Sequence, residues 1–218
     1  MRTRIKFCGL VRADDVRTAA ALGVDAVGFV FHPGSARAVD AAHAAGLRRL
    51  LPSYVAAVGL FVNAPPGEVR RLAGAVGLDV VQFHGDETPD ECRHERPAGM
   101  TYWRAVRMRG TSDLLESFAR FGDAEALLLD SFSHGYGGSG EAFDWSWIPA
   151  GRPLPIVLSG GLTAETVATA IGQVRPMMVD VSSGIQAAGS EADPRAKSRE
   201  RMERFVSEVL RADAAQRN

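Results

Sequence analysis

The sequence has few cysteines, no long apolar run and no excess of either charge. Cys8 and Cys92 are its only cysteines, too few for a disulfide framework, so both thiols are expected to be free in a reduced, cytoplasmic setting. No stretch reaches the roughly 18 apolar residues that a membrane span needs, and the first residues lack the apolar run of a signal peptide. The 25 basic and 26 acidic side chains give a net charge of -1, which offers no electrostatic reason to bind nucleic acid or an anionic membrane.

The five histidines show no pair at metal-ligand spacing with a carboxylate, so no metal site is predicted. With 218 residues, of which 46% are hydrophobic, the chain is long enough for one large core. We predict one domain over residues 1–211 and a polar C-terminal tail over residues 212–218.

Short β-rich runs alternate with segments of helical periodicity along the chain. The runs begin at intervals of roughly 20 to 30 residues, which leaves room for one helix between each pair. The predicted strands are Arg4–Cys8, Ala26–Val30, Val55–Val62, Val80–His84, Thr101–Val106, Ala126–Asp130, Pro155–Ser159 and Met177–Ser182. Apolar helix faces are predicted at Val69, Leu72, Ala73 and Val76, at Val167, Ala170, Ile171 and Val174, and at Met202, Phe205, Val206, Val209 and Leu210.

Eight βα units in so short a chain favour a closed α/β structure, a (β/α)8 barrel, over an open doubly wound sheet. The first strand-to-helix turn, Cys8–Arg12, lacks the G-x-G-x-x-G fingerprint of dinucleotide-binding sheets. Chemically capable residues instead follow many different strands. A barrel brings those strand ends to one face, where active sites of this architecture lie.

Two turns rich in glycine and serine are candidates for binding a phosphate group. Gly160 and Gly161 follow the seventh predicted strand, and Ser182, Ser183 and Gly184 follow the eighth. Glycines let the backbone approach a ligand closely, and the loops after strands seven and eight are the usual phosphate site of barrels. The alternative is a pair of ordinary turns, but their placement favours phosphate binding.

Cys8 and Asp130 are the candidates for proton transfer. Cys8 ends the first strand; a lone cysteine there is most often a small buried hydrophobe, but a thiolate at that position can act as a general base. Asp130 ends the sixth strand, and a glycine-rich loop rather than a helix follows it, so a capping role is disfavoured. An aspartate enclosed beside a ligand can act as a general acid. Cys92 lies in a polar stretch away from any strand end and is interpreted as incidental.

Three further features lie on the same predicted face. Arg37 follows the second strand and can grip a carboxylate or phosphate, although a solvated loop arginine is the default interpretation. His84 ends the fourth strand, where a catalytic and a structural, hydrogen-bonded histidine are equally plausible. Residues 133–140 have the composition of a lid that excludes water, with a merely disordered loop as the alternative.

The sequence resembles the phosphoribosylanthranilate isomerase family, whose members are enzymes of tryptophan biosynthesis. The resemblance rests on a series of short motifs and on their order along the chain. The matching motifs run from Lys6 to the last helix and are Lys6–Leu10, Ser35–Arg37, Val81–Gly85, Leu129–Ser131, Gly137–Gly140 with Phe143–Trp145, Ser159–Leu162 and Val179–Gly184. The resemblance implies an Amadori rearrangement of N-(5'-phosphoribosyl)anthranilate to 1-(2-carboxyphenylamino)-1-deoxyribulose 5-phosphate. It also implies that no cofactor is needed, because the imine itself is the electron sink.

The resemblance assigns roles by position. Asp130 protonates the ribose ring oxygen and opens the ring to a Schiff base, and Cys8 removes the proton from C2, which leaves an enolamine that tautomerises to the ketone. Arg37 holds the anthranilate carboxylate. The remaining substrate-binding residues are His84 and the phosphate-binding residues Gly160, Gly161, Ser182, Ser183 and Gly184.

One segment departs from the family pattern. After Ser183-Gly184 the family usually has a valine–glutamate pair and then Gly-x-Lys-Asp, whereas this chain has Ile185–Asp193. The glutamate is replaced by Gln186, and the lysine is missing from this run. We therefore expect an effect on substrate preference or turnover, and none on the acid–base pair.

A contact inside the barrel also follows from strand parity. If Cys8 faces inward, so does Lys6, and Asp180 on the eighth strand shares the parity of Ser182. A buried unpaired lysine is costly, so we predict that Lys6 and Asp180 form an ion pair.

Two other functions stay open at this point: an isomerase of a related phosphoribosyl amine, and a non-catalytic phosphosugar-binding barrel. The expected partner is a small phosphorylated molecule, and the chain can be a monomer or a homodimer.

Overall fold

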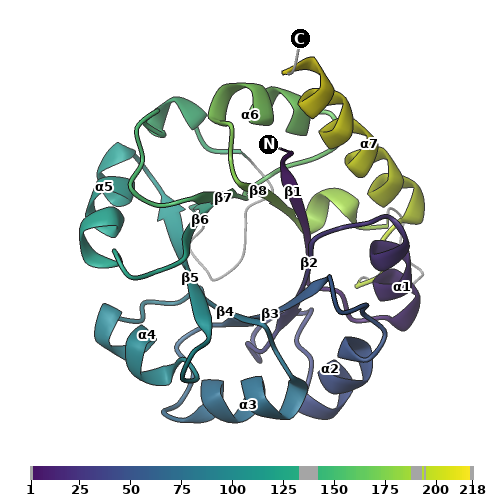
Figure 1. Ribbon diagram of the computed structural model, residues 1–218. Coiled ribbons are helices and arrows are strands. Elements are labelled where there is room, and N and C mark those ends of the chain that lie inside the picture. The colour runs from purple at the N-terminus through teal and green to yellow at the C-terminus, as the bar shows by residue number, and fades with distance from the viewer. Residues whose placement is uncertain (1, 133–141, 188–192, 194, 217–218) are drawn as a thin grey trace.

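A closed ring of eight parallel strands forms the centre of the protein. The computed structural model describes residues 2–132, 142–187, 193 and 195–216. The strands pair in chain order, and β1 closes the ring against β8, as the end-on view in Figure 1 shows. They are β1 (Arg4–Cys8), β2 (Ala26–Val30), β3 (Ala56–Phe61), β4 (Val80–Phe83), β5 (Thr101–Met108), β6 (Ala126–Ser131), β7 (Ile156–Leu158) and β8 (Met178–Val181). The predicted barrel is confirmed, since an open sheet has two unpaired edges.

Helices surround the ring on the outside (Figure 1). They are α1 (Ala13–Ala21), α2 (Ala41–Arg48), α3 (Glu68–Val76), α4 (Pro89–Glu95), α5 (Thr111–Arg120), α6 (Val167–Val174) and α7 (Arg199–Ala215), with short 3-10 helices η1 (Trp145–Trp147) and η2 (Ser183–Ile185). The predicted bounds of β1 and β2 are confirmed. The other strands differ from prediction by one or two residues at their ends, where hydrogen bonding to the neighbouring strand decides the boundary.

The alternation of side chains along β1 fixes what faces the barrel interior. Phe7 points outward and packs edge-on against Phe205 of α7, with ring centroids 6.1 Å apart. Lys6 and Cys8 therefore point inward. The floor of the interior is a separate apolar cluster made of Ala26, Val58, Val80, Trp103, Ala105, Ala126, Leu128, Val157 and Met178. Above this floor the interior becomes polar.

The apolar faces predicted for α3 and α6 are buried as expected. The stripe predicted for α7 needs one correction: Leu210 is 52% exposed, and Ala212 is buried in its place. The reason is geometric, because Met202, Phe205 and Val209 already define the buried face and Leu210 lies about 100° around the helix from Val209.

The chain end also departs from the expected division at residue 211. Helix α7 continues to Ala215, and Asp213 is buried. Its carboxylate accepts two hydrogen bonds from Thr3, from the backbone N–H and from the hydroxyl, both at 2.7 Å. The last turns of α7 are thus fastened to the start of β1, so residues 212–215 belong to the barrel rather than to a tail.

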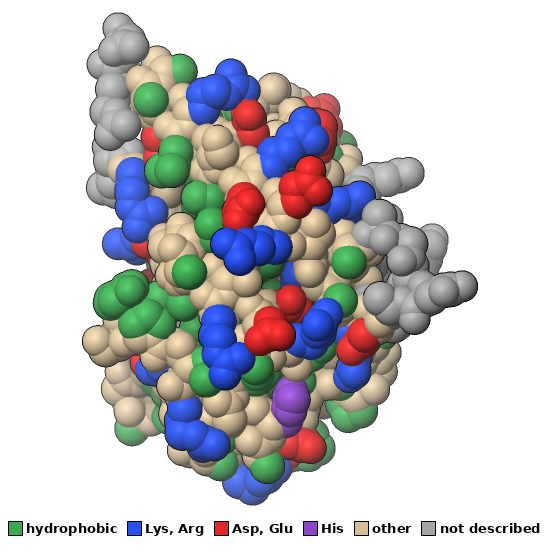
Figure 2. Space-filling model, turned by 90° about the vertical axis from the view of Figure 1, so that its right-hand side faces the viewer, with side chains coloured by type: hydrophobic (Ala, Val, Ile, Leu, Met, Phe, Trp, Pro, Cys, Tyr) green, Lys and Arg blue, Asp and Glu red, His purple; other side chains and the backbone are tan. Residues whose placement is uncertain are grey.

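Basic and acidic side chains are interspersed on the outer face of the helices. Figure 2 shows this for the face toward which α1 and α7 lie, where blue and red side chains alternate and neither sign forms a large patch. Among the described residues, no helix is long and apolar enough to cross a membrane.

Candidate active site

A small cavity opens at the carboxyl end of the barrel. Its volume is about 110 Å³, and it is lined by Cys8, Val30, His32, Ser35, Arg37, Leu60, Val62, Gln82, His84, Asp130, Ser159, Asp180 and Ser182. These residues come from seven of the eight strands or the loops that follow them. The barrel therefore brings Cys8, Arg37, His84, Asp130 and Ser182 to one site, as the predicted arrangement required.

Cys8 lies at the end of β1 and is only 6% exposed. Burial raises the pKa of its thiol above the usual 9.0, and the Lys6 ammonium opposes that rise. Gly28 of β2 lies opposite Cys8, and a β-carbon built on it would be 2.8 Å from Cys8 Sγ. The glycine thus provides the space that the thiol occupies.

Lys6 and Asp180 form the ion pair that strand parity predicted. Lys6 Nζ donates to Asp180 Oδ2 at 2.9 Å, and the two residues are aligned in the β1–β8 register. Both side chains are almost fully inaccessible to solvent. The Lys6 side chain lies beside Cys8, because a β-carbon built on Gly28 would be 3.2 Å from Lys6 Cε and 2.8 Å from Cys8 Sγ. The pair therefore lies directly beneath the thiol.

Asp130 and His84 face each other across the cavity. Asp130 ends its run of leucines on β6 and is 7% exposed, and His84 Nε2 lies 3.3 Å from its Oδ2. The other carboxylate oxygen accepts the Ser131 backbone N–H at 2.9 Å. Gln82 Nε2 lies 2.9 Å from His84 Nδ1. Because an amide nitrogen can only donate, His84 Nδ1 is the acceptor, and Nε2, on the side of Asp130, carries the proton.

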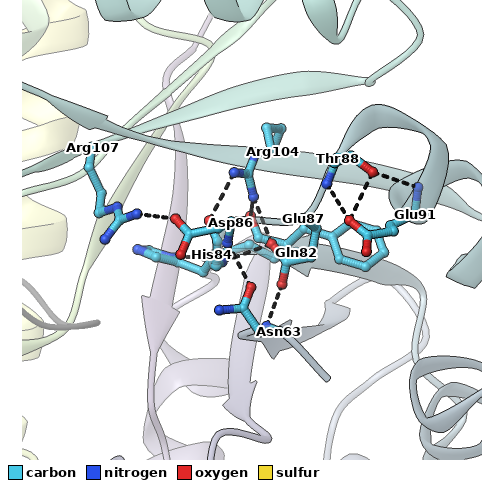
Figure 3. Close-up of polar contacts among 11 residues, drawn as sticks. Asn63, Gln82, His84, Asp86, Glu87, Thr88, Glu91, Arg104 and Arg107 are labelled. Carbon is cyan, nitrogen blue, oxygen red and sulfur yellow. Dashed lines mark hydrogen bonds and ion pairs between the residues drawn. The ribbon is translucent and has the colours of Figure 1, made fainter. Parts of the chain in front are cut away.

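The loop that carries His84 is fixed by a network of charged side chains (Figure 3). Glu87 accepts the backbone N–H of Gly85 at 2.9 Å and an Arg104 guanidinium N–H at 2.8 Å, and its second oxygen accepts the Asn63 N–H at 2.7 Å. Arg104 also donates to the Gly85 carbonyl at 2.8 Å. The histidine therefore sits on a rigid turn, which agrees with both of its predicted roles.

The two glycine-rich turns lie against each other. Gly160 and Gly161 have φ values of +81° and +65°, a conformation that favours glycine. A β-carbon on Gly184 would be 2.1 Å from the Leu162 carbonyl oxygen, so the loop after β8 contacts the loop after β7. Ser183–Ile185 forms η2 at this point. The structure thus places the five predicted phosphate-binding residues in one pair of adjoining turns, of which Ser182 lines the cavity.

Arg37 reaches the cavity from the loop after β2. Its guanidinium Nη2 donates to Gln186 Oε1, and its Nε is buried without a hydrogen-bond partner among the described residues. The Gln186 backbone carbonyl accepts from Arg201 of α7 at 3.0 Å. The residue that replaces the family's glutamate is thus a direct partner of Arg37, and it leaves the guanidinium charge without a carboxylate at this contact.

Lys197 is a residue beside the site that the sequence interpretation missed. It is buried, and its Nζ donates to the Ser182 carbonyl at 2.7 Å and to the Ser182 hydroxyl at 3.3 Å. Burial lowers the pKa of Lys197 to about 8, and the nearby Arg37 charge adds to the effect. The expectation that the lysine is missing needs correction. Residues 185–193 contain no lysine, but Lys197, just before α7, brings an ammonium to the loop after β8.

The remaining predictions for the site concern Cys92, metals and the loop over residues 133–140. Cys92 is buried on α4, and burial raises the pKa of its thiol to about 12, so it cannot supply a thiolate near neutral pH. No group of three or more histidine, cysteine or acidic side chains suited to a metal ion occurs in the part of the chain that the structure describes. The predicted lid lies outside the described residues.

Known proteins match this chain over nearly its whole length. The family described as N-(5'-phosphoribosyl)anthranilate isomerase matches residues 5–207. The chain belongs to this family. An N-(5'-phosphoribosyl)anthranilate isomerase from Methylibium petroleiphilum is 50% identical over 214 residues, which cover 98% of this chain and 97% of the relative.

Solved structures of the family match the fold as well. The crystal structure of the isomerase from Thermotoga maritima is 36% identical and superimposes with a TM-score of 0.86, covering 95% of this chain and 98% of that one. A second family structure, in complex with reduced 1-(o-carboxyphenylamino)-1-deoxyribulose 5-phosphate, is 34% identical with a TM-score of 0.82 and the same coverage. The predicted family, fold and enzyme class are therefore confirmed.

Proposed function

We propose that this enzyme isomerises N-(5'-phosphoribosyl)anthranilate with Asp130 as the general acid and Cys8 as the general base. The observation that carries the proposal is that both groups line one cavity, from strands on different sides of the barrel. A family member binds a reduced form of the product, which supports the same substrate class here.

The order of events follows from the chemistry of the substrate. Asp130 donates a proton to the ribose ring oxygen, and the C1–O bond breaks to give a protonated Schiff base. Cys8 then removes the proton from C2, and the electrons of that bond move into the imine to give an enolamine. Because the imine accepts the electron pair of the broken C2–H bond, the residues of the enzyme only have to move protons.

The rest of the site supplies orientation. The turns after β7 and β8 offer backbone N–H groups to the phosphate, and Lys197 holds the second turn from beneath. Arg37 faces the cavity with a guanidinium that can bind the anthranilate carboxylate in two parallel hydrogen bonds. His84 Nε2 lies 3.3 Å from Asp130 Oδ2, so the imidazole limits how far that carboxyl group can move.

Loss of substrate fluorescence measures the reaction directly. We expect Cys8→Ser and Asp130→Asn each to lower kcat by about 10²- to 10⁴-fold, which is the usual contribution of a positioned acid or base. Cys92→Ala is the matched control, because its thiol is buried away from the cavity, and it should keep the wild-type rate. Activity that survives both substitutions would exclude these roles.

The cellular location and the oligomeric state need measurements other than enzyme activity. The cytoplasmic setting can be tested by cell fractionation. Light scattering across a concentration range distinguishes a monomer from a homodimer.

A further inference from the structure

The proposed reaction leaves the two proton-transfer groups in the wrong states for the next turnover. Asp130 gives its proton to the ring oxygen, and Cys8 takes one from C2. The cycle therefore ends with a Cys8 thiol and an Asp130 carboxylate, whereas it began with a thiolate and a carboxylic acid. One proton must move from Cys8 to Asp130 per turnover, with no net exchange with solvent.

Burial of Cys8 disfavours the return of its thiol to the thiolate after each turnover. It raises the pKa of the thiol above the ordinary value, and the Lys6 ammonium opposes that rise. Direct exchange with bulk water is restricted, since Cys8 and Asp130 are both buried. A path within the barrel is therefore of value to the enzyme.

The polar groups beneath the cavity form most of such a path. The Lys6 side chain lies beside Cys8, since both contact the same position at Gly28, and its ammonium lowers the thiol pKa; on its other side it donates to Asp180 Oδ2 at 2.9 Å. Asp180 lines the same cavity as Asp130 and His84, and the Asp130 charge acts on its carboxyl group. The Lys6–Asp180 pair thus lies between the base and the acid.

One oxygen atom of this pair indicates a position where a hydroxyl group binds. Asp180 Oδ1 is buried and has no hydrogen-bond partner among the described residues. A buried carboxylate oxygen without a donor is costly, so the cavity beside it is suited to a molecule that can both donate and accept, such as a water or a substrate hydroxyl. The Gln82 Oε1 atom is a second acceptor of this kind at the same cavity.

We propose that the buried Lys6–Asp180 pair returns the proton from Cys8 to Asp130 in each catalytic cycle. The inference rests on the roles of Cys8 and Asp130 proposed above. The Lys6 ammonium first passes a proton to Asp180 Oδ2, which leaves a neutral amine with a lone pair. The Cys8 S–H bond then breaks as Lys6 Nζ gains that proton and becomes an ammonium again. Asp180 then loses a proton across the cavity through the bound hydroxyl, and Asp130 gains one. Lys6 and Asp180 end as they began, so they are relay residues that do not act on the substrate carbon.

Asp180→Asn separates a relay from a structural ion pair. The amide keeps the size of the side chain and an acceptor for Lys6 but cannot be protonated in the relay. Stopped-flow mixing with excess substrate should give a first phase near the wild-type rate, with an amplitude of at most one product per site. The later turnovers should be roughly 10²-fold slower than that phase. Imidazole or formate buffer, which can carry the proton instead, should restore the later rate and leave the first phase unchanged.

Asp213→Asn is the matched control, since Asp213 is also a buried hydrogen-bonded aspartate but lies on α7 away from the cavity. It should lower stability and show no new slow phase. Both phases slowed equally in Asp180→Asn, or both unchanged, would overturn the relay. Lys6→Gln provides the same two-phase measurement if Asp180→Asn does not fold.

A label experiment on the wild-type enzyme tests the premise without any substitution. Substrate carrying deuterium at C2 of the ribose should yield product without the label, because Cys8 passes the deuteron to Lys6. Label retained at C1 of the product would mean that Cys8 hands it directly back to the substrate, which would also overturn the relay. Absence of any turnover by the wild type would instead refute the proposed function, so the two failures are distinguishable.

Discussion

Gly28→Ala tests how tightly the barrel interior packs around Cys8, the proposed general base. The added methyl group would lie 2.8 Å from Cys8 Sγ and 3.2 Å from Lys6 Cε. Non-bonded heavy atoms prefer about 3.5–4.0 Å, so the thiol must move by roughly 1 Å. A misplacement of about 1 Å can cost ~10²-fold in rate, and overpacking costs about 1–3 kcal/mol in the free energy of unfolding.

We therefore expect kcat/KM to fall about 10²-fold in the fluorescence assay while the protein stays folded at 25 °C. Gly74→Ala on α3 is the matched control, because nothing lies within 4 Å of its added methyl group. That change replaces a helical glycine and should raise the free energy of unfolding by about 1 kcal/mol with no change in rate. A Gly28→Ala variant with the wild-type kcat/KM would refute the proposed placement of the thiol.

Three further predictions concern pH and stability. The raised pKa of Cys8 means that kcat/KM should keep rising with pH above neutrality, and Lys6→Met should move that rise to higher pH because Lys6 lowers the thiol pKa. The pKa of Lys197 falls from 10.5 to about 8, so between these values the unfolded chain binds a proton that the folded protein does not, and stability rises with pH. In urea unfolding, the stability difference between wild type and Lys197→Met should therefore increase by up to about 3 kcal/mol from pH 7 to 10.5, and a constant difference would contradict the burial of its charge. Asp213→Ala leaves the Thr3 donors without their acceptor and should cost about 1–3 kcal/mol of unfolding free energy, measured by the same method.

Local patterns in the sequence determined the architecture of this protein. Short β-rich runs mark the strands, because parallel strands covered on both faces are buried throughout, and 3.6-residue repeats mark the helix faces that pack on them. Strand parity also predicted the ion pair of Lys6 with Asp180, since alternation along β1 and β8 is a property of the backbone alone. Even the strand ends were predicted to within one or two residues.

Contacts between segments far apart in the chain could not be predicted in this way. Gln186 meets Arg37 across 149 residues, and their contact depends on how the loops after β2 and β8 lie on the barrel rim. Lys197 reaches Ser182 because the segment before α7 folds back in an antiparallel bridge with Gln186. No periodicity marks such a return, so the lysine seemed to be missing.

Cys8 and Asp130 illustrate the difference between what the sequence determined and what the tertiary structure decided. Their residue types and their positions at strand ends are written in the sequence, and so is the family to which the chain belongs. Only the closed barrel decided that both line one cavity, that His84 Nε2 lies 3.3 Å from Asp130, and that Lys6 lies beside the thiol. The physical reason is that ring closure sets distances across the interior, whereas the sequence sets only the direction of each side chain from its own strand.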